Sequence, residues 1–339
     1  MHGPPFALSK KTKPMAANAS PQAPRSIFDL VTARAGILRA LARHPSWAGL
    51  ETRIADGLRA HFAALPPQMQ RVDDSTPAVI LNQIIRYEAV HEIRTLRELW
   101  RRLSADRRCY GLFSRSIPDE PLVFIELALT TGVVADVGTI LDPDGPVVEP
   151  DACTCAMFYS ISSCHEGLRG VPLGGLLIRR VLDRLRSEWP RLQTFATVSP
   201  VPGFRSWLDR LARSQGGTLS EIIACLDEST WLTNPELGER VKATLLPLCA
   251  SYLLEAKRGA EPLDAVARFH LGNGARLERV NWLGDRSAAG LARSVGITAN
   301  YVYDPSEMDA NHDVYGRTHT VVTTPQVTTL ARAGAPQAA

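Results

Sequence analysis

The spacing of apolar residues predicts three helices in the first part of the chain. Apolar side chains recur at intervals of three and four residues in three runs, at 27–41, 50–65 and 79–87. Ser26 and Asp29 have the spacing of a capping box at the start of the first run. Pro45 and Pro66 end the first two runs. We therefore predict an N-terminal helical domain over residues 26–88.

The apolar period changes after a polar, arginine-rich helix expected at residues 95–103. Residues 109–113 and 122–129 alternate like a pair of strands, and Pro118-Asp119-Glu120-Pro121 predicts the turn that joins them. The second domain, expected over residues 89–331, therefore contains β-structure.

A strand, a glycine-rich loop and a helix follow one another between residues 155 and 185. Gly167, Gly170 and Gly174 precede the predicted helix, so the backbone can come close to a ligand there. Free N–H groups and the positive end of the helix dipole make such a loop suitable for a phosphate or pyrophosphate. The spacing matches neither the Rossmann fingerprint nor a P-loop, and a simple tight turn is the alternative.

Two polar residues have positions suited to chemistry. Ser199 follows a predicted strand at 192–198, at the end of the sheet where open α/β folds bind ligands. The alternative is a turn or N-cap serine beside Pro200. His270 borders a glycine turn, where an imidazole with an ordinary pKa exchanges protons near neutrality. The alternative is a histidine that is hydrogen-bonded within the core.

Composition and charge exclude several classes of function. The 38 basic residues are balanced by 35 acidic ones, without the basic stripe of a nucleic-acid-binding protein. No apolar run reaches the ~18 residues of a membrane span. The Cys153-Thr-Cys155 and Cys164-His165 pairs lack the usual zinc spacing, so we expect no metal. Few cysteines and no secretory h-region predict a cytoplasmic protein with a disordered leader at 1–25 and a flexible tail at 332–339.

Five separated segments share their order and spacing with one known family. They are 158–174, Ser199-Pro-Val-Pro-Gly-Phe204, Phe269-His-Leu-Gly-Asn-Gly-Ala275, Val280-Asn-Trp282 and Ala299-Asn-Tyr-Val-Tyr303. Together with Arg107-Arg-Cys-Tyr110 upstream, they resemble malonyl-CoA decarboxylases over residues 80–305. The resemblance implies a helical N-terminal segment followed by a GNAT acyltransferase-like mixed β-sheet domain flanked by helices, an α+β or α/β fold.

The resemblance also implies an activity and a set of site residues. Members of the family convert malonyl-CoA to acetyl-CoA and carbon dioxide without a metal or organic cofactor, and they self-associate, so a homo-oligomer is expected. Ser199 and His270 match the catalytic serine and histidine, and Tyr303 matches a tyrosine of the same pocket. The CoA-contacting loop corresponds to Arg169, Gly170, Val171, Pro172, Leu173, Gly174 and Gly175.

Two departures from the family pattern leave other functions open. The family loop often carries a glutamate where this chain has Pro172, and the helical segment is short. A second hypothesis is therefore an acyltransferase that moves an acetyl or malonyl group from CoA to an amine or a carrier-bound acceptor. A third is an inactive CoA-binding or assembly module.

Overall fold

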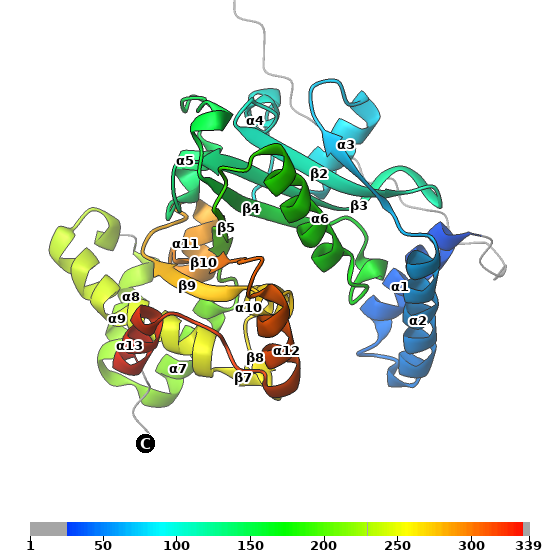
Figure 1. Cartoon of the computed structure of the whole chain (residues 1–339). Coiled ribbons are helices and arrows are strands. Elements are labelled where there is room, and N and C mark those ends of the chain that lie inside the picture. The colour runs from blue at the N-terminus through cyan, green and yellow to red at the C-terminus, as the bar shows by residue number, and fades with distance from the viewer. Residues whose placement is uncertain (1–25, 229, 335–339) are drawn as a thin grey trace, which may run out of the picture.

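A mixed eight-stranded sheet forms the centre of the protein, whose computed structural model describes residues 26–228 and 230–334 (Figure 1). The strands are β1 (Gln68–Val72), β2 (Arg107–Ser114), β3 (Ile117–Thr130), β4 (Cys155–Ser163), β5 (Thr194–Thr197), β6 (Ser199–Pro200), β9 (Arg276–Asn281) and β10 (Thr298–Val302). Their order is β1-β2-β3-β4-β5-β10-β6, and β9 pairs with β10. Among these described strands only β4 and β5 pair in parallel, so the expected mixed sheet is confirmed.

The sheet divides between β4 and β5. These strands pair only from Cys155 to Phe158 on β4 and from Thr194 to Thr197 on β5. Beyond that point β4 continues along β3, with an extra residue, Tyr159, that bulges the strand. The chain after β5 instead enters β6, which pairs with β10. Because the two halves of the sheet separate here, side chains from both can line an opening.

Helices cover both faces of the sheet formed by β1 to β4. On one face, α6 (Leu173–Glu188) buries Leu177, Val181 and Leu185 in the main core. On the other, α3 (Ala78–Tyr87) and α4 (Leu96–Arg102) pack with Phe124 of β3 (Figure 1). Successive residues of a strand point to opposite faces, so the continuous apolar run of β3 follows from burial on both sides.

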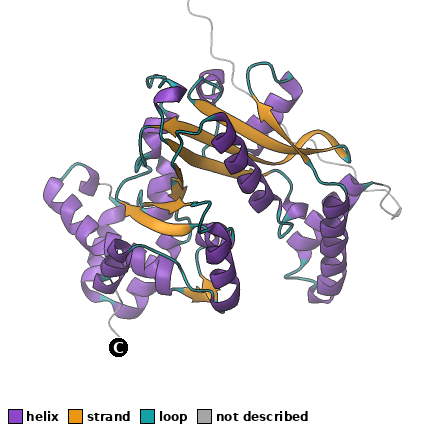
Figure 2. Ribbon diagram, viewed as in Figure 1, coloured by secondary structure: helices purple, strands orange, loops and turns teal. Residues whose placement is uncertain are grey.

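The C-terminal half surrounds β9 and β10 with helices (Figure 2). These are α7 (Phe204–Gln215), α8 (Gly217–Asp227), α9 (Pro235–Glu255), α10 (Ala265–Gly272), α11 (Ala288–Ser294), α12 (Met308–Thr318) and α13 (Pro325–Ala333). The helix α9 continues through Pro247. Two short strands, β7 (Lys257–Arg258) and β8 (Glu261–Pro262), form a hairpin before α10.

The N-terminal region is only partly helical. Its first two helices, α1 (Ile27–Ala40) and α2 (Ala48–Ala64), form as predicted, and the Ser26–Asp29 capping box is present. Residues 68–72, however, form β1 and pair with β2 at the edge of the sheet. The prediction of an all-helical region over 26–88 is therefore wrong at this strand. A five-residue polar strand has little periodicity of its own, and its partner lies far along the chain.

Two boundaries also differ from the predictions. The β2–β3 turn lies at Arg115-Ser116, and residues 118–121 belong to β3, where Asp119 adopts a φ of 60°. The predicted tail begins too early, because α13 continues to Ala333. The predicted leader at 1–25 and residues 335–339 of the tail lie outside the described residues.

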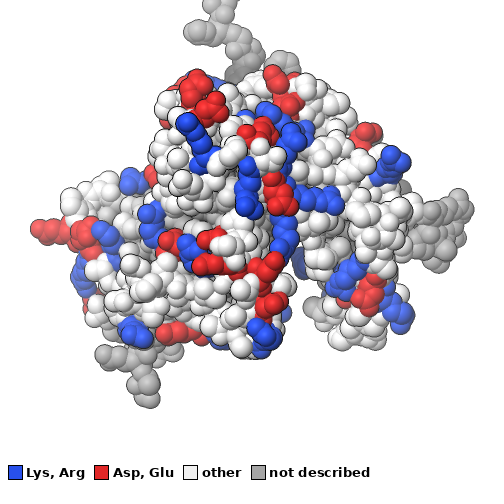
Figure 3. Space-filling model, viewed as in Figure 1, with Lys and Arg blue, Asp and Glu red and all other residues white. Residues whose placement is uncertain are grey.

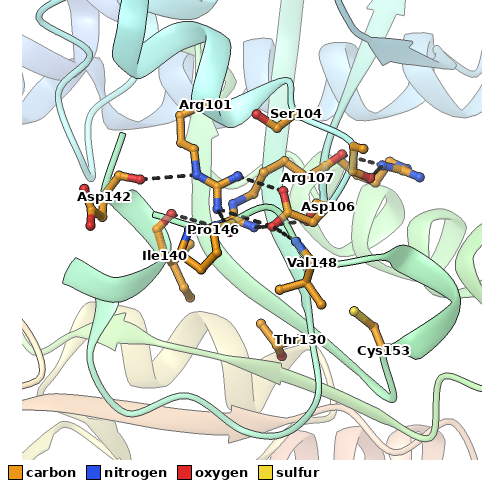
Figure 4. A network of polar contacts seen from close by, with 12 residues as sticks. Arg101, Ser104, Asp106, Arg107, Thr130, Ile140, Asp142, Pro146, Val148 and Cys153 are labelled. Atoms are coloured by element: carbon orange, nitrogen blue, oxygen red, sulfur yellow. Dashed lines mark hydrogen bonds and ion pairs between the residues drawn. The ribbon is translucent and has the colours of Figure 1, made fainter. Parts of the chain in front are cut away.

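Two arginines of α4, Arg101 and Arg102, are buried, although that helix was predicted to be polar. Arg101 donates to Asp106 at 2.7 Å and to the carbonyls of Asp142 and Pro146 (Figure 4). Arg107 pairs with the same carboxylate at 2.7 Å and donates to the carbonyl of Ile140. This network fixes α5 (Val137–Leu141) and the loop after it against the sheet.

The surface in Figure 3 carries Lys and Arg side chains beside Asp and Glu. Positive and negative charges are interspersed over the elements visible there. Within 26–228 and 230–334, no helix has the length and apolarity needed to cross a bilayer.

Candidate active site

All but one of the predicted site residues line one cavity where β4 and β5 separate. This cavity has a volume of ≈ 790 Å³, and its walls come from the second half of β4, residues 168–175, residues 197–200 and α10. Ser199, His270 and the whole loop from Arg169 to Gly175 line it. Tyr303 lies behind His270 and reaches the cavity through it. Segments distant in the sequence therefore converge at the division of the sheet.

A chain of hydrogen bonds joins Tyr303, His270, Ser199 and Thr197. Tyr303 Oη lies 2.7 Å from Nδ1 of His270, whose Nε2 lies 3.0 Å from Oγ of Ser199. Ser199 donates to Oγ1 of Thr197 at 2.8 Å, and Thr197 also accepts from the amide of Tyr301 at 3.1 Å. Since Ser199 donates its only proton to Thr197, its oxygen accepts from Nε2–H. Nδ1 is then the acceptor for the phenol of Tyr303.

Local structure fixes each member of this chain. Ser199 pairs with Ala299 of β10 directly after the end of β5. His270 lies in the last turn of α10, a helix capped by Asp264, which accepts from two backbone amides at 2.9 Å. The ring of Tyr301 stacks on the imidazole at 4.6 Å. The imidazole is thus held in the plane and direction needed to meet Ser199.

The hydrogen-bond chain from Tyr303 to Ser199 carries no formal charge. Burial lowers the pKa of His270 to about 3, with no contribution from a charged neighbour. Burial likewise raises the pKa of Tyr303. A buried imidazole without an anionic partner stays neutral because its charged form cannot be solvated. The expectation that His270 titrates near neutrality is therefore wrong, since it assumed a solvated turn rather than a buried helix.

The loop before α6 has the features expected of an anion-binding turn. Gly170 has a φ of +76°, a conformation that favours glycine. Pro172 occupies the N-cap position of α6, and no side chain caps this end of the helix. The first amides of a helix have no partner within it, so this end presents N–H groups toward the cavity. Arg169 is exposed, whereas Val171 and Leu173 are buried and anchor the turn.

The glycines at the start of α6 bring the loop and the histidine helix together. A Cβ at Gly174 would lie 2.8 Å from the ring of Phe269, and one at Gly175 would overlap the Asn273 side chain. Both neighbours belong to α10 or its C-cap, beside His270. The sequence predicts that Gly174 lets the backbone come close to a phosphate or pyrophosphate. In the structure its contact is with α10.

Sequence analysis missed Thr197, which holds the hydroxyl of Ser199. The signal was present, because Thr197 and Ser199 are two positions apart, the period at which strand side chains share a face. The bulge at Tyr159 on the opposite wall was also missed. A bulge depends on the pairing register, which no local pattern records. Among the described residues, no three His, Cys, Asp or Glu side chains come together as a metal site.

Comparison with known proteins identifies the family. The model of the malonyl-CoA decarboxylase C-terminal domain matches residues 66–339. The chain belongs to the malonyl-CoA decarboxylase family. Mitochondrial malonyl-CoA decarboxylases from Anser anser anser and Rattus norvegicus are 35% and 33% identical to it over 284 and 287 residues. The matches cover 76% and 77% of this chain but only 56% and 58% of those proteins.

Solved structures of the same family share the fold. The malonyl-CoA decarboxylase from Rhodopseudomonas palustris is 39% identical, with a TM-score of 0.83 over 89% of this chain and 75% of the other. The one from Agrobacterium vitis is 39% identical, with a TM-score of 0.84 over 90% and 76%. The expected arrangement of N-terminal helices followed by a helix-flanked mixed sheet is therefore confirmed. Because the vertebrate relatives are mitochondrial, the cytoplasmic location stays a prediction.

Proposed function

We propose that this member of the malonyl-CoA decarboxylase family converts malonyl-CoA to acetyl-CoA and carbon dioxide. The observation that carries the proposal is the convergence of the Ser199–His270–Tyr303 chain and the 169–175 loop on one cavity. The reaction uses only this chain's side chains and backbone, with the CoA thioester as substrate. Family membership and the similarity to relatives that bear this name support the assignment.

The cavity suits the two ends of a CoA thioester. The diphosphate binds at the uncapped start of α6, where amides and the helix dipole favour negative charge. The pantetheine arm follows the opening between β4 and β5, and the malonyl group reaches Ser199 and His270. The volume of ≈ 790 Å³ falls within the ~300–1,000 Å³ typical of small-molecule sites.

The uncharged hydrogen-bond chain favours loss of the carboxylate. Burial is the cause of the pKa shifts of His270 and Tyr303, so the part of the cavity wall that they form is neutral and solvates a carboxylate poorly. Removing water from this carboxylate raises the energy of the ground state relative to carbon dioxide and a delocalised enolate. The carbon–carbon bond breaks, and its electron pair moves into the thioester enolate. Donors around the enolate oxygen contribute ~3–4 kcal/mol each in comparable sites.

The hydrogen-bond chain then supplies a proton to the enolate carbon. The hydroxyl of Ser199 gives its proton to the enolate carbon, and the proton on Nε2 of His270 moves to the serine oxygen. Nδ1 of His270 then takes the phenol proton of Tyr303. A thioester enolate is a far stronger base than a phenolate, so this transfer is favourable even with the raised pKa of Tyr303. Water returns a proton to Tyr303 after acetyl-CoA leaves. His270 acts as a general acid from its neutral form, a role worth roughly 10²–10⁴-fold.

Product analysis by mass spectrometry distinguishes the proposal from its alternatives. Purified protein incubated with malonyl-CoA should produce acetyl-CoA without free CoA thiol. Free thiol that forms only when an amine acceptor is present would instead indicate acyl transfer. CoA binding without any product would indicate a binding module.

The expected homo-oligomer is supported by the exposed apolar side chains Phe28, Trp47 and Leu50 on the N-terminal region, and light scattering measures the oligomeric state directly.

A further inference from the structure

The two N-terminal helices contact the loop that leads into α6. Figure 1 shows α1 and α2 beside the end of α6 at which this loop lies. The stretch from Glu166 to Gly170 begins with the 3₁₀ turn η3 (Glu166–Leu168) and ends at the glycine with positive φ. Its last three residues, Leu168 to Gly170, line the cavity. The helices therefore lie where they can control the shape of the predicted CoA site.

Arg34 of α1 connects both helices to this stretch. Its side chain is only 4% exposed, and its Nη1 donates to the carbonyl of Gly167 at 2.7 Å. Its Nε and Nη2 donate to one carboxylate oxygen of Glu51 on α2, at 2.9 and 2.5 Å. Such charge-assisted bonds with a fixed guanidinium plane are directional and strong. The pair thus holds the Gly167 carbonyl at a defined point between the two helices.

Three further contacts act on the same stretch. Arg59 of α2 donates from Nε and Nη2 to the carbonyl of Gly170, each at 3.2 Å. Arg39 of α1 pairs with Glu166 at 2.6 Å. A Cβ at Gly167 would overlap the carbonyl of Val31, so backbone of α1 packs directly on the turn. The two helices therefore fix both ends of the stretch.

We propose that the buried Arg34–Glu51 pair, assisted by Arg59, positions the 166–170 stretch so that the start of α6 is ready to bind CoA. These are positioning residues, because none of them needs to touch the acyl group or the Ser199–His270 chain. The inference rests on the proposed CoA site. A loop ordered in advance binds without the entropy cost of ordering, which improves affinity rather than the chemical step.

The test replaces the pair as a unit, Arg34→Met with Glu51→Leu, so that no unpaired charge stays buried. If the loop then adopts the binding conformation about a tenth of the time, the Kd for CoA and the KM for malonyl-CoA rise about 10-fold. The kcat should stay within about 3-fold, because the hydrogen-bond chain is unchanged. Arg53→Met is the matched control. Arg53 is an exposed residue of α2, and its substitution should leave the Kd for CoA unchanged.

Arg59→Met provides a second variant. Because the Arg59 side chain is 44% exposed, this substitution breaks no buried ion pair and should leave the protein folded. It should raise the Kd for CoA by about 3-fold, as expected for one hydrogen-bonding group at a partly exposed site. Amide hydrogen exchange over residues 166–172, measured without CoA, should be faster in both variants than in Arg53→Met. Unchanged exchange and unchanged Kd in Arg59→Met would overturn the inference, as would a fall in kcat alone. Failure of wild-type protein to bind CoA would instead refute the proposed function, while exchange still tests the loop contacts.

Discussion

Two buried polar clusters of this protein differ in whether their side chains carry formal charge. The cluster around Arg101, Asp106 and Arg107 is ionic, and its arginines also donate to backbone carbonyls (Figure 4). The chain from Tyr303 through His270 to Ser199 contains no formal charge. The first contributes no residue to the cavity, whereas the second opens into it.

The difference indicates which cluster can do chemistry. Burial acts to raise the pKa of Asp106, but bonds from Arg101 and the charge of Arg107 hold the pKa below its ordinary value. A carboxylate so fully bound is fixed in one state and stabilises the fold. The neutral chain has protons that can move at little electrostatic cost and faces space for a ligand. We therefore expect changes in the ionic cluster to affect stability and changes in the neutral chain to affect the reaction.

The largest effect is expected from breaking the neutral chain. Ser199→Ala and His270→Ala should each lower kcat by at least about 10²-fold, the lower bound for losing a general acid. The Kd for CoA should change little, because the 169–175 loop stays intact. Steady-state kinetics and calorimetric titration with CoA measure both quantities, with Ser214→Ala on the exposed side of α7 as a control. Wild-type kcat in either variant would refute the assignment.

The ionic cluster should show the opposite response. Asp106→Asn leaves two buried arginines without their carboxylate and should lower the free energy of unfolding by about 3–5 kcal/mol. The kcat of the folded fraction should stay within about 2-fold, since Asp106 does not line the cavity. Chemical denaturation and kinetics at low temperature measure the two effects.

Acid should reproduce part of this loss in the wild-type protein. Because the folded pKa of Asp106 is lowered, its contribution is present above the ordinary carboxyl range and disappears as pH falls through the folded value. Asp106→Asn should lack that part of the acid sensitivity. An identical pH dependence of stability in both proteins would contradict the ionic role.

Thr197 should have an intermediate effect on the neutral chain. Thr197→Val removes the acceptor of the Ser199 hydroxyl and should lower kcat by about 10-fold, as expected for one hydrogen bond. Thr197→Ser keeps that oxygen and should stay within about 2-fold of wild type. Equal rates in the valine and serine variants would show that Thr197 does not orient Ser199.

The smallest effect is expected from pH. With the pKa of His270 lowered to about 3, its neutral form persists at every pH above that value. The kcat should therefore vary by less than about 2-fold between pH 5 and 8, where an unperturbed histidine would titrate. If kcat instead falls as the pH decreases, with an inflection between pH 6 and 7, the claim that burial keeps the His270 imidazole neutral over this range is refuted.

Sequence predicted the parts of this molecule that depend on local pattern. The helices α1, α2 and α3 and the strand–loop–helix leading into α6 follow from apolar spacing and caps. The grouping of Ser199 with His270 came from resemblance, because the two residues are 71 positions apart and no period connects them. The strand β1, the bulge at Tyr159 and the burial of His270 depend on which distant segments pair. These features become visible only in three dimensions.

Deuterium incorporation during a single turnover tests the central claim most directly. Wild-type protein in excess over malonyl-CoA in D₂O should form acetyl-CoA that carries one deuterium on its methyl group, since the carbon protonated is the one that lost carbon dioxide. Ser199→Ala at the same concentration should form it at least about 10²-fold more slowly while still binding CoA. Equal rates of deuterated acetyl-CoA formation in the two proteins, or none in the wild type, would contradict the account.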